Sequence, residues 1–151
     1  MIDLDRFIVE VDRIITATHL YDELYCKEDA IAVLNNVSSA AFKIIQISLH
    51  NDIIMSVSRL LFDGKSYKNN GHEYTYLSQY QLAEKYLDLI DDEIQKDRDQ
   101  VRTLKETLGI QDFRDLILAH NDKAILIGEM AAPKHNIETY KLLELLKDIQ
   151  R

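Results

Sequence analysis

The feature that most limits the fold of this chain is a segment without glycine or proline, from Ala30 to Phe62. Apolar residues stand on several sides of this segment when it is wound as a helix, which is typical of a helix that its neighbours pack around. The 151 residues include only four glycines and one proline, too few turn formers for an all-β fold. The sequence therefore predicts long helices.

Flanking segments extend this prediction. The polar cluster Asn35 to Ser39 predicts a kink or a split, because short polar side chains compete for backbone hydrogen bonds. From Asp3 to Tyr25, apolar residues recur every three or four positions and predict an amphipathic helix. Residues 63–74 combine two glycines with lysine, serine and asparagine, which predicts an exposed loop.

The second half of the chain shows the same helical patterning. A seven-residue apolar repeat from Tyr76 to Leu108 predicts a third long helix, which Gly109 is placed to end as a C-terminal cap. Asp112 is a candidate cap for a short helix that runs to about His120.

A last helix is predicted from Ile137 to Ile149, with Asn136 as its cap and Tyr140 on its apolar stripe. No linker, internal repeat or low-complexity segment divides the chain. The expected architecture is a single all-α domain over residues 1–151. It is a bundle of about five helices, made of three long helices, a short helix and a C-terminal helix.

Composition limits the partners of such a bundle. The formal net charge of −8 argues against a broad nucleic-acid surface, so no DNA partner is expected and an RNA site would have to be local. Cys26 is the only cysteine, which excludes an intrachain disulfide and fits a reducing compartment. No signal segment is recognised, and no window approaches the roughly 20 apolar residues of a membrane span. We expect a cytoplasmic protein without membrane contact.

Several kinds of catalytic chemistry find no support in the sequence. None of the five histidines has a glutamate three residues before it, as the di-metal sites of helical bundles require. His50 and His120 each precede an aspartate by two residues, but such pairs point in different directions on a helix. There is no Gly-x-Ser-x-Gly elbow. We therefore expect no metal, no cofactor and no activated serine.

The segment from Phe113 to Lys123 holds the densest cluster of chemically active groups. Within it, Arg114 and His120 are separated by five residues and match the Arg-polar-spacer-His signature of HEPN domains. The letters RDLILAHND resemble the abortive-infection branch of that family. The segment Ser56 to Gly64, SVSRLLFDG, is similar to one that ends a long helix in the same branch. The order of helices is also similar, so the resemblance covers most of the chain.

The resemblance implies a metal-independent endoribonuclease, a toxin or antiviral effector, whose active site forms where two protomers meet. In this interpretation His120 would exchange protons, since an ordinary imidazole titrates at about 6.5. Arg114 would direct its positive charge at phosphate oxygens. Asp115 would orient an arginine or tune a histidine, and Asn121 and Lys123 would position phosphate or backbone. An antitoxin or another protein partner is also implied.

One position departs from the family pattern. Some HEPN toxins carry a tyrosine two residues after the histidine, which a partner nucleotidyltransferase modifies to silence the toxin. Asp122 occupies that position here, so control by that route is in doubt.

The spacing of the motif leaves two geometries open. At about 100° per residue, six steps place Arg114 and His120 roughly 120° apart around a straight helix, on different faces. Either the helix begins or bends inside the motif, or the two groups serve different copies of the site. The second geometry requires a homodimer with a two-fold axis.

Other interpretations of these residues also stay open. His120 could interact only with a helix C-terminal dipole, while Arg114 pairs with a surface acid. Arg59 and Asp63, four residues apart on the second helix, are predicted to form an ion pair. The competing functions are a non-catalytic helical dimer that serves as a partner-binding or scaffold module, and nucleotide binding without cleavage through Arg114 and Lys123.

Overall fold

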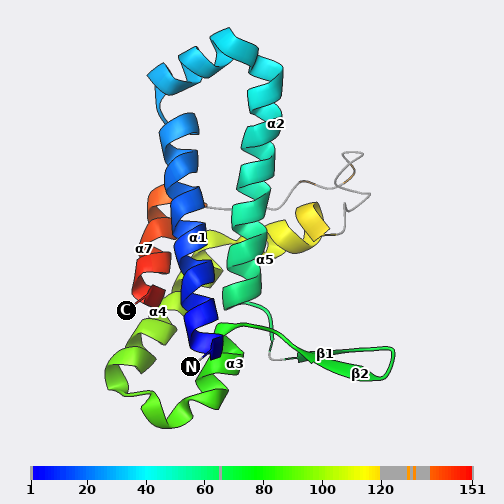
Figure 1. Ribbon diagram of the computed structural model, residues 1–151, viewed down its shortest axis with the longest axis vertical. Coiled ribbons are helices and arrows are strands. Elements are labelled where there is room, and N and C mark those ends of the chain that lie inside the picture. Colours follow the sequence, from blue (N-terminus) through cyan, green and yellow to red (C-terminus); the bar gives the residue numbers. More distant parts are fainter. Residues whose placement is uncertain (1, 65, 120–128, 130, 132–136, 151) are drawn as a thin grey trace.

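The computed structural model describes residues 2–64, 66–119, 129, 131 and 137–150 (Figure 1). Helices dominate it, and the prediction of an all-α bundle is confirmed. The α-helices are α1 (Ile2–Tyr25), α2 (Glu28–Leu61), α3 (Gln79–Lys85), α4 (Asp92–Leu108), α5 (Ile110–Phe113) and α7 (Thr139–Gln150). The remaining elements are a 3₁₀ turn η1 (Leu87–Leu89), a π-helix η2 (Arg114–Ala119) and the strands β1 (Ser66–Asn69) and β2 (His72–Thr75).

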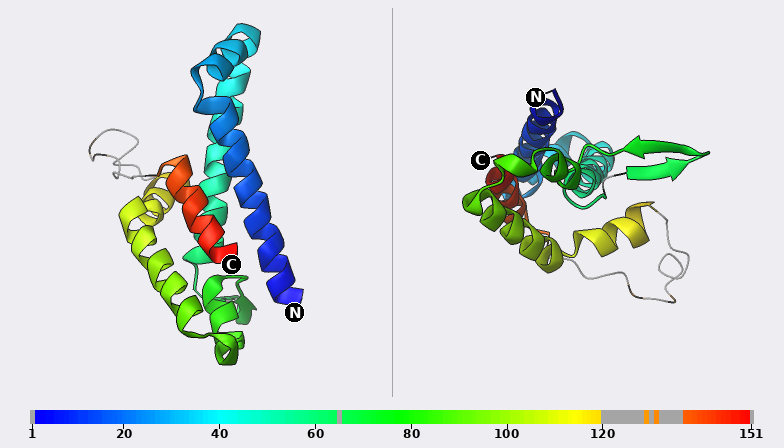
Figure 2. Two further views of the ribbon diagram at one scale, coloured as in Figure 1. Left: turned by 90° about the vertical axis from the view of Figure 1, so that its left-hand side faces the viewer. Right: turned by 90° about the horizontal axis from the view of Figure 1, so that it is seen from below.

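The two long helices α1 and α2 form an antiparallel hairpin that runs through most of the molecule (Figures 1 and 2). The backbone of α2 breaks at Ser38, where φ is −168° and ψ is 93°. The predicted kink at Asn35 to Ser39 is therefore confirmed. Residues before the break cross the tip of the hairpin, and those after it run back alongside α1 (Figure 1).

The hydrophobic core lies in the half of the hairpin away from its tip, where α7 packs on both α1 and α4. Its largest fully buried side chains are Val11, Ile14, Ile54, Val57, Leu61, Leu108, Ile110, Leu145 and Leu146. In the half of α2 near the tip, up to about Leu49, none of the described residues is buried. The expectation that neighbours pack around all of Ala30 to Phe62 is therefore right only for its second half.

The prediction of one long third helix is wrong. The chain between Tyr76 and Leu108 forms α3, η1 and α4 instead. Asp91 starts a new helix, because its carboxylate accepts a hydrogen bond of 2.9 Å from the backbone N–H of Ile94. Leu87 and Ile94, two positions of the apolar repeat, are exposed as a result.

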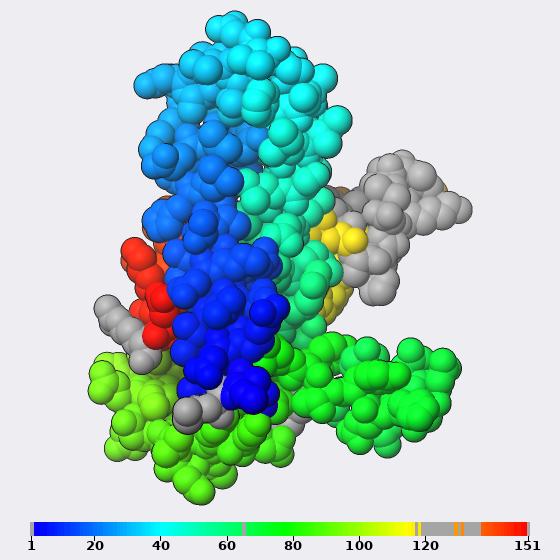
Figure 3. All heavy atoms as spheres, viewed as in Figure 1, coloured from blue at the N-terminus to red at the C-terminus, as the bar shows by residue number. Residues whose placement is uncertain are grey.

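The predicted loop at residues 63–74 contains a β-hairpin, which extends away from the bundle (Figure 3). Asn70 and Gly71 have φ values of +50° and +79°, the left-handed pair that a tight hairpin turn needs. The rings of Tyr67 and Tyr74 pair across the strands with centroids 5.2 Å apart. Both strands are exposed along their length.

Gly109 ends α4 in the left-handed conformation, φ +64°, which confirms the predicted cap. α5 begins at the next residue, so Asp112 lies in its first turn and is not its cap. α7 begins at Thr139 and buries Leu142, Leu145 and Leu146, while Tyr140 is exposed. The proposed cap Asn136 lies outside the described residues.

Among the described helices, α2 is long and apolar enough to cross a membrane by length and composition, with a mean hydropathy of 1.3 in its most apolar window. By this criterion the expectation that no window approaches a membrane span is wrong. The match rests on length and composition alone, and the helical backbone of α2 is interrupted at Ser38.

Candidate functional site

Arg114 lies at the centre of a group of three charged side chains, here called the Arg114 cluster, with Asp63 and Asp115. Its Nη1 donates a hydrogen bond of 2.6 Å to Oδ1 of Asp63, and its Nε donates one of 2.7 Å to Oδ1 of Asp115. Asp63 follows the end of α2, whereas Arg114 and Asp115 open η2. The cluster therefore joins two elements that are 51 residues apart in the sequence.

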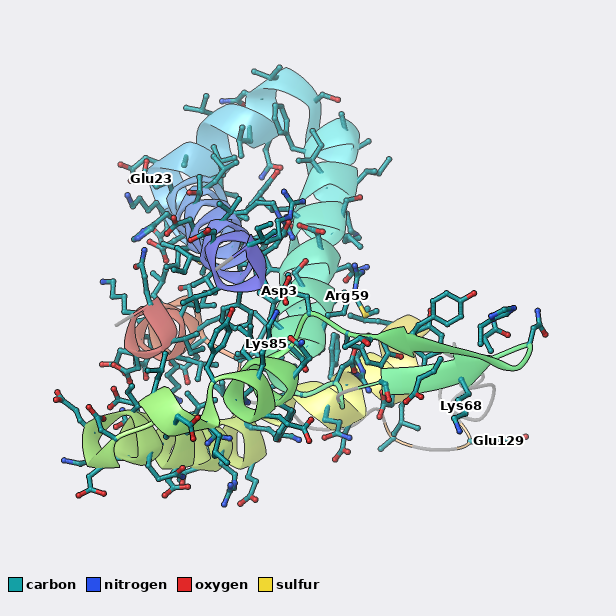
Figure 4. All side chains as sticks on the ribbon, turned by 60° about the horizontal axis from the view of Figure 1, so that its bottom comes forward. Asp3, Glu23, Arg59, Lys68, Lys85 and Glu129 are labelled. Carbon is teal, nitrogen blue, oxygen red and sulfur yellow. The ribbon has the colours of Figure 1, made fainter. Side chains whose placement is uncertain are left out.

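The end of α2 explains why Asp63 faces Arg114. The helix stops at Leu61, and the backbone N–H groups of Phe62 and Asp63 both bond to the carbonyl of Ser58. Asp63 thus lies beyond the helix, and its carboxylate accepts the hydrogen bond from Arg114. The predicted ion pair between Arg59 and Asp63 is wrong for this reason, because an i,i+4 pair needs both residues on one helix. Arg59 is exposed on α2 (Figure 4).

The Arg114 cluster is only partly accessible to solvent. The side chains of Arg114 and Asp63 keep 18% and 20% of their surface exposed, and Asp115 keeps 39%. Burial by itself would lower the pKa of the Arg114 guanidinium, but hydrogen bonds to Asp115 and Asp63 outweigh it and raise the pKa above its ordinary value. Arg114 is thus a fixed cation held by two carboxylates.

The guanidinium of Arg114 has more N–H groups than its described partners engage. A guanidinium has five N–H groups, and the bonds to Asp63 and Asp115 use two of them. The two carboxylates fix the plane of the guanidinium, so its other N–H groups have a set direction. An N–H group held in a set direction can donate a hydrogen bond to a phosphate oxygen without reorganising first.

The type of helix changes at the residue where the motif begins. Ile110–Phe113 is α-helical, and Arg114–Ala119 is a π-helix, whose turns are wider. The change of helix type falls at the start of the motif, and His120 lies outside the described residues, so both geometries predicted for the motif stay predictions. π-Helical turns within α-helices occur frequently at functional sites.

Aromatic packing holds the start of the motif against α2. The ring of Phe113 meets the ring of His50 edge-on, with centroids 5.9 Å apart and planes at 88°. The His50 ring in turn lies 5.9 Å from that of Tyr21 on α1. Two consecutive residues, Phe113 and Arg114, therefore attach the motif to the long helix by an aromatic contact and an ion pair.

The predicted site residues divide into two groups. The structure brings Arg114 and Asp115 together, whereas His120, Asn121 and Lys123 lie outside the described residues. Asp63 joins the site although the sequence interpretation assigned it to Arg59. Its signal was the similarity of Ser56 to Gly64 to a family segment, which marked the region without identifying its partner. Within the described ranges, no group of three metal-binding side chains comes together.

Comparison with known proteins gives one match. The AbiU2 family model, which describes a HEPN domain, matches residues 1–151. Searches of curated proteins and of solved structures found no match. The match covers the whole sequence and agrees with the helical bundle. The chain therefore belongs to the AbiU2 family of HEPN-type abortive-infection domains.

Proposed function

We propose that this chain is a metal-independent endoribonuclease, a toxin or abortive-infection effector that acts in the cytoplasm as a homodimer. The observation that carries the proposal is the fixed guanidinium of Arg114 at the start of the motif, held by Asp63 and Asp115. Membership of a HEPN family supports an RNA substrate.

Cleavage of RNA requires three events: activation of a ribose 2′-hydroxyl, stabilisation of a phosphorane that gains negative charge, and protonation of the leaving oxygen. Arg114 would stabilise the phosphorane, and His120 would exchange the protons. Asp115 would orient Arg114, a role that its 2.7 Å hydrogen bond supports. Asn121 and Lys123 would position the phosphate or the backbone around it.

A homodimer would supply each active site from both copies. The tip half of α2, at the other end of this helix from Asp63, offers a surface on which two copies could associate, here called the α2 apolar face: Val33, Val37, Ile44, Ile45 and Ile47. These side chains are between 47% and 72% exposed, and Lys43 is the one charged residue from Ala30 to Leu49. Large apolar side chains exposed in such number on one segment favour an interface. A surface with so few charges can face its own copy across a two-fold axis with little repulsion.

A second function, a non-catalytic dimer that acts as a scaffold or partner-binding module, rests on a different observation. The Arg114 cluster contains two carboxylates and one cation, so it repels phosphate at long range. The net charge of −8 adds to this repulsion. In this case the cluster would serve only to attach η2 to the end of α2.

One assay separates the two functions. Purified protein is incubated with total RNA in a chelator, beside His120→Ala and Arg114→Ala. Arg102→Ala is the matched control, since Arg102 is an exposed arginine that pairs only loosely with Asp99, at 3.6 Å. The enzyme predicts cleavage by the parent and the control, and a loss of roughly 100-fold or more in the other two variants. A stable parental dimer that leaves every RNA intact would support the scaffold instead.

A further inference from the structure

An apolar groove lies at the end of the bundle opposite the hairpin tip, away from the Arg114 cluster. It is bounded by the start of α1, by α3, η1 and α4, and by the end of α7, and its volume is about 390 Å³. Figure 3 shows the start of α1 lying over the segment that forms α3, η1 and α4. Phe7, Leu82 and Val101 form the buried floor.

The walls of the groove carry apolar side chains into solvent. Leu4 and Ile8 do so from α1, and Leu89 and Ile94 do so from the opposite side. A small molecule enclosed in the groove would contact the atoms of these side chains that line it, but not those that face solvent. An elongated partner would cover the floor and the walls together, as an amphipathic helix does when its apolar residues enter a groove.

The charges around the groove indicate which charge the binding segment of the partner should carry. Among the described residues that line it, Asp97 and Asp148 carry negative charge and Arg98 is the one cation. The segment from Glu84 to Asp99, which supplies one side of the groove, holds seven carboxylates and three basic side chains, and of these Asp97 and Arg98 line the groove itself. Such a rim repels an anionic membrane, a nucleic acid or a second copy of the same acidic groove. It attracts a segment with lysine or arginine beside its apolar face.

An ion pair holds one wall in place. Lys85, at the end of α3, donates a hydrogen bond to the carboxylate of Asp3, at the start of α1. Figure 4 shows these two side chains close together between α1 and α3. The pair therefore links two of the elements that bound the groove, and ordering a binding surface in advance reduces the entropy that binding must overcome.

We propose that this groove binds a basic amphipathic helix of a partner protein. Apolar side chains spaced three, four and seven residues apart would enter it, and flanking lysines or arginines would meet the acidic rim. The surface is remote in sequence from the motif of residues 113–123, and the proposal holds whether or not the Arg114 cluster cleaves RNA.

The test uses two synthetic peptides of about 18 residues with the same leucines at helical spacing. One has lysine and arginine beside the leucines, and the other has glutamate there. Fluorescence anisotropy with the full chain measures their affinities at low and at moderate salt. The basic peptide is expected to bind at least about tenfold more tightly, with a difference that shrinks as salt is added. Equal binding of both peptides, or no binding, would overturn the proposal.

Two neighbouring leucines provide a matched pair of variants. Leu89 lines the groove and Leu87 does not, although their exposed fractions are nearly equal, 70% and 67%. Leu89→Ser is expected to lower the affinity for the basic peptide by about tenfold or more, whereas Leu87→Ser should change this affinity little. Circular dichroism confirms that both variants fold. The same loss in both variants would reject the groove, as would self-association of the parent that Leu89→Ser abolishes.

Discussion

Asp63 and Arg114 form a hydrogen-bonded ion pair of 2.6 Å between two side chains that are each about four-fifths buried. The pair joins the end of α2 to the first turn of η2, so it fixes the motif on the longest helix of the described structure. Partly buried charged pairs of this kind are costly to break from one side, because the remaining charge loses its partner.

Asp63→Asn keeps the shape of the side chain and removes its charge. We expect the free energy of unfolding to fall by about 1–3 kcal/mol, because a charge-assisted hydrogen bond to a partly buried guanidinium is weakened. Urea denaturation measures the change. Asp99→Asn, which disturbs an exposed pair of 3.6 Å with Arg102, should cost about 0.5 kcal/mol or less. If the free energy of unfolding falls equally in the two variants, the Asp63 pair stabilises the fold no more than an exposed ion pair does.

Gly109→Ala tests the junction between α4 and α5. Gly109 has φ +64°, a region that a side chain disfavours by about 1–2 kcal/mol, so unfolding should become easier by that amount. Gly64→Ala is the control, since its added methyl group would meet nothing within 4 Å and its backbone is not left-handed. Thermal denaturation followed by circular dichroism compares the two. A Gly109 variant as stable as the Gly64 variant would contradict the strain argument.

Ile44→Lys places a charge on the α2 apolar face. Because Ile44 is exposed within the protomer, the change should leave the fold intact while it dissociates the proposed homodimer. Sedimentation velocity at micromolar concentration measures the oligomeric state. Val9→Lys makes the same change at an exposed residue of α1 outside this face and should leave the dimer unchanged. If Ile44→Lys stays dimeric, the two copies meet elsewhere.

Mixing two inactive variants tests whether the active site is shared. If Arg114 of one copy works with His120 of the other, a heterodimer of Arg114→Ala and His120→Ala contains one intact site and one doubly mutated site. A mixture that has exchanged subunits should then regain a measurable part of the parental RNA cleavage. Each variant alone stays inactive and serves as the control. A mixture that remains inactive after verified exchange would place both residues of each site in one copy.

The parts of the fold that the sequence predicts correctly depend on local chemistry. The three- and four-residue apolar spacing from Asp3 to Tyr25 gives α1 almost residue for residue, and the polar cluster around Ser38 gives the break in α2. Gly109 ends α4 as expected, because its left-handed conformation suits glycine.

The errors arise where two local signals compete. The apolar repeat from Tyr76 to Leu108 favours one helix, but the carboxylate of Asp91 caps a new one, and the repeat residue Leu87 becomes exposed. The Asn70–Gly71 pair is a strong hairpin signal within a segment interpreted as a loop. In both places the polar residue that caps or turns the chain prevails over the longer pattern around it.

The sequence predicts only part of the candidate site. The letters of the motif identify Arg114 and Asp115, but the partner Asp63 depends on where the chain returns to α2 after 51 residues. No spacing rule connects two such positions, and the i,i+4 rule assigned Asp63 to Arg59 instead. Long-range pairing of this kind follows from the packed structure and not from periodicity.

Gly109 is the only residue between α4 and α5, so the direction of the motif depends on very few backbone dihedral angles. Arg114 lies five residues further along, a lever arm of about 7–8 Å along a helix. A rotation of only 10° at Gly109 would displace Arg114 by about 1.3 Å, enough to break a hydrogen bond of normal length. The hydrogen bond to the carboxylate of Asp63 restrains Arg114 against such a rotation. The direction of the guanidinium is therefore fixed both by the backbone at Gly109 and by Asp63.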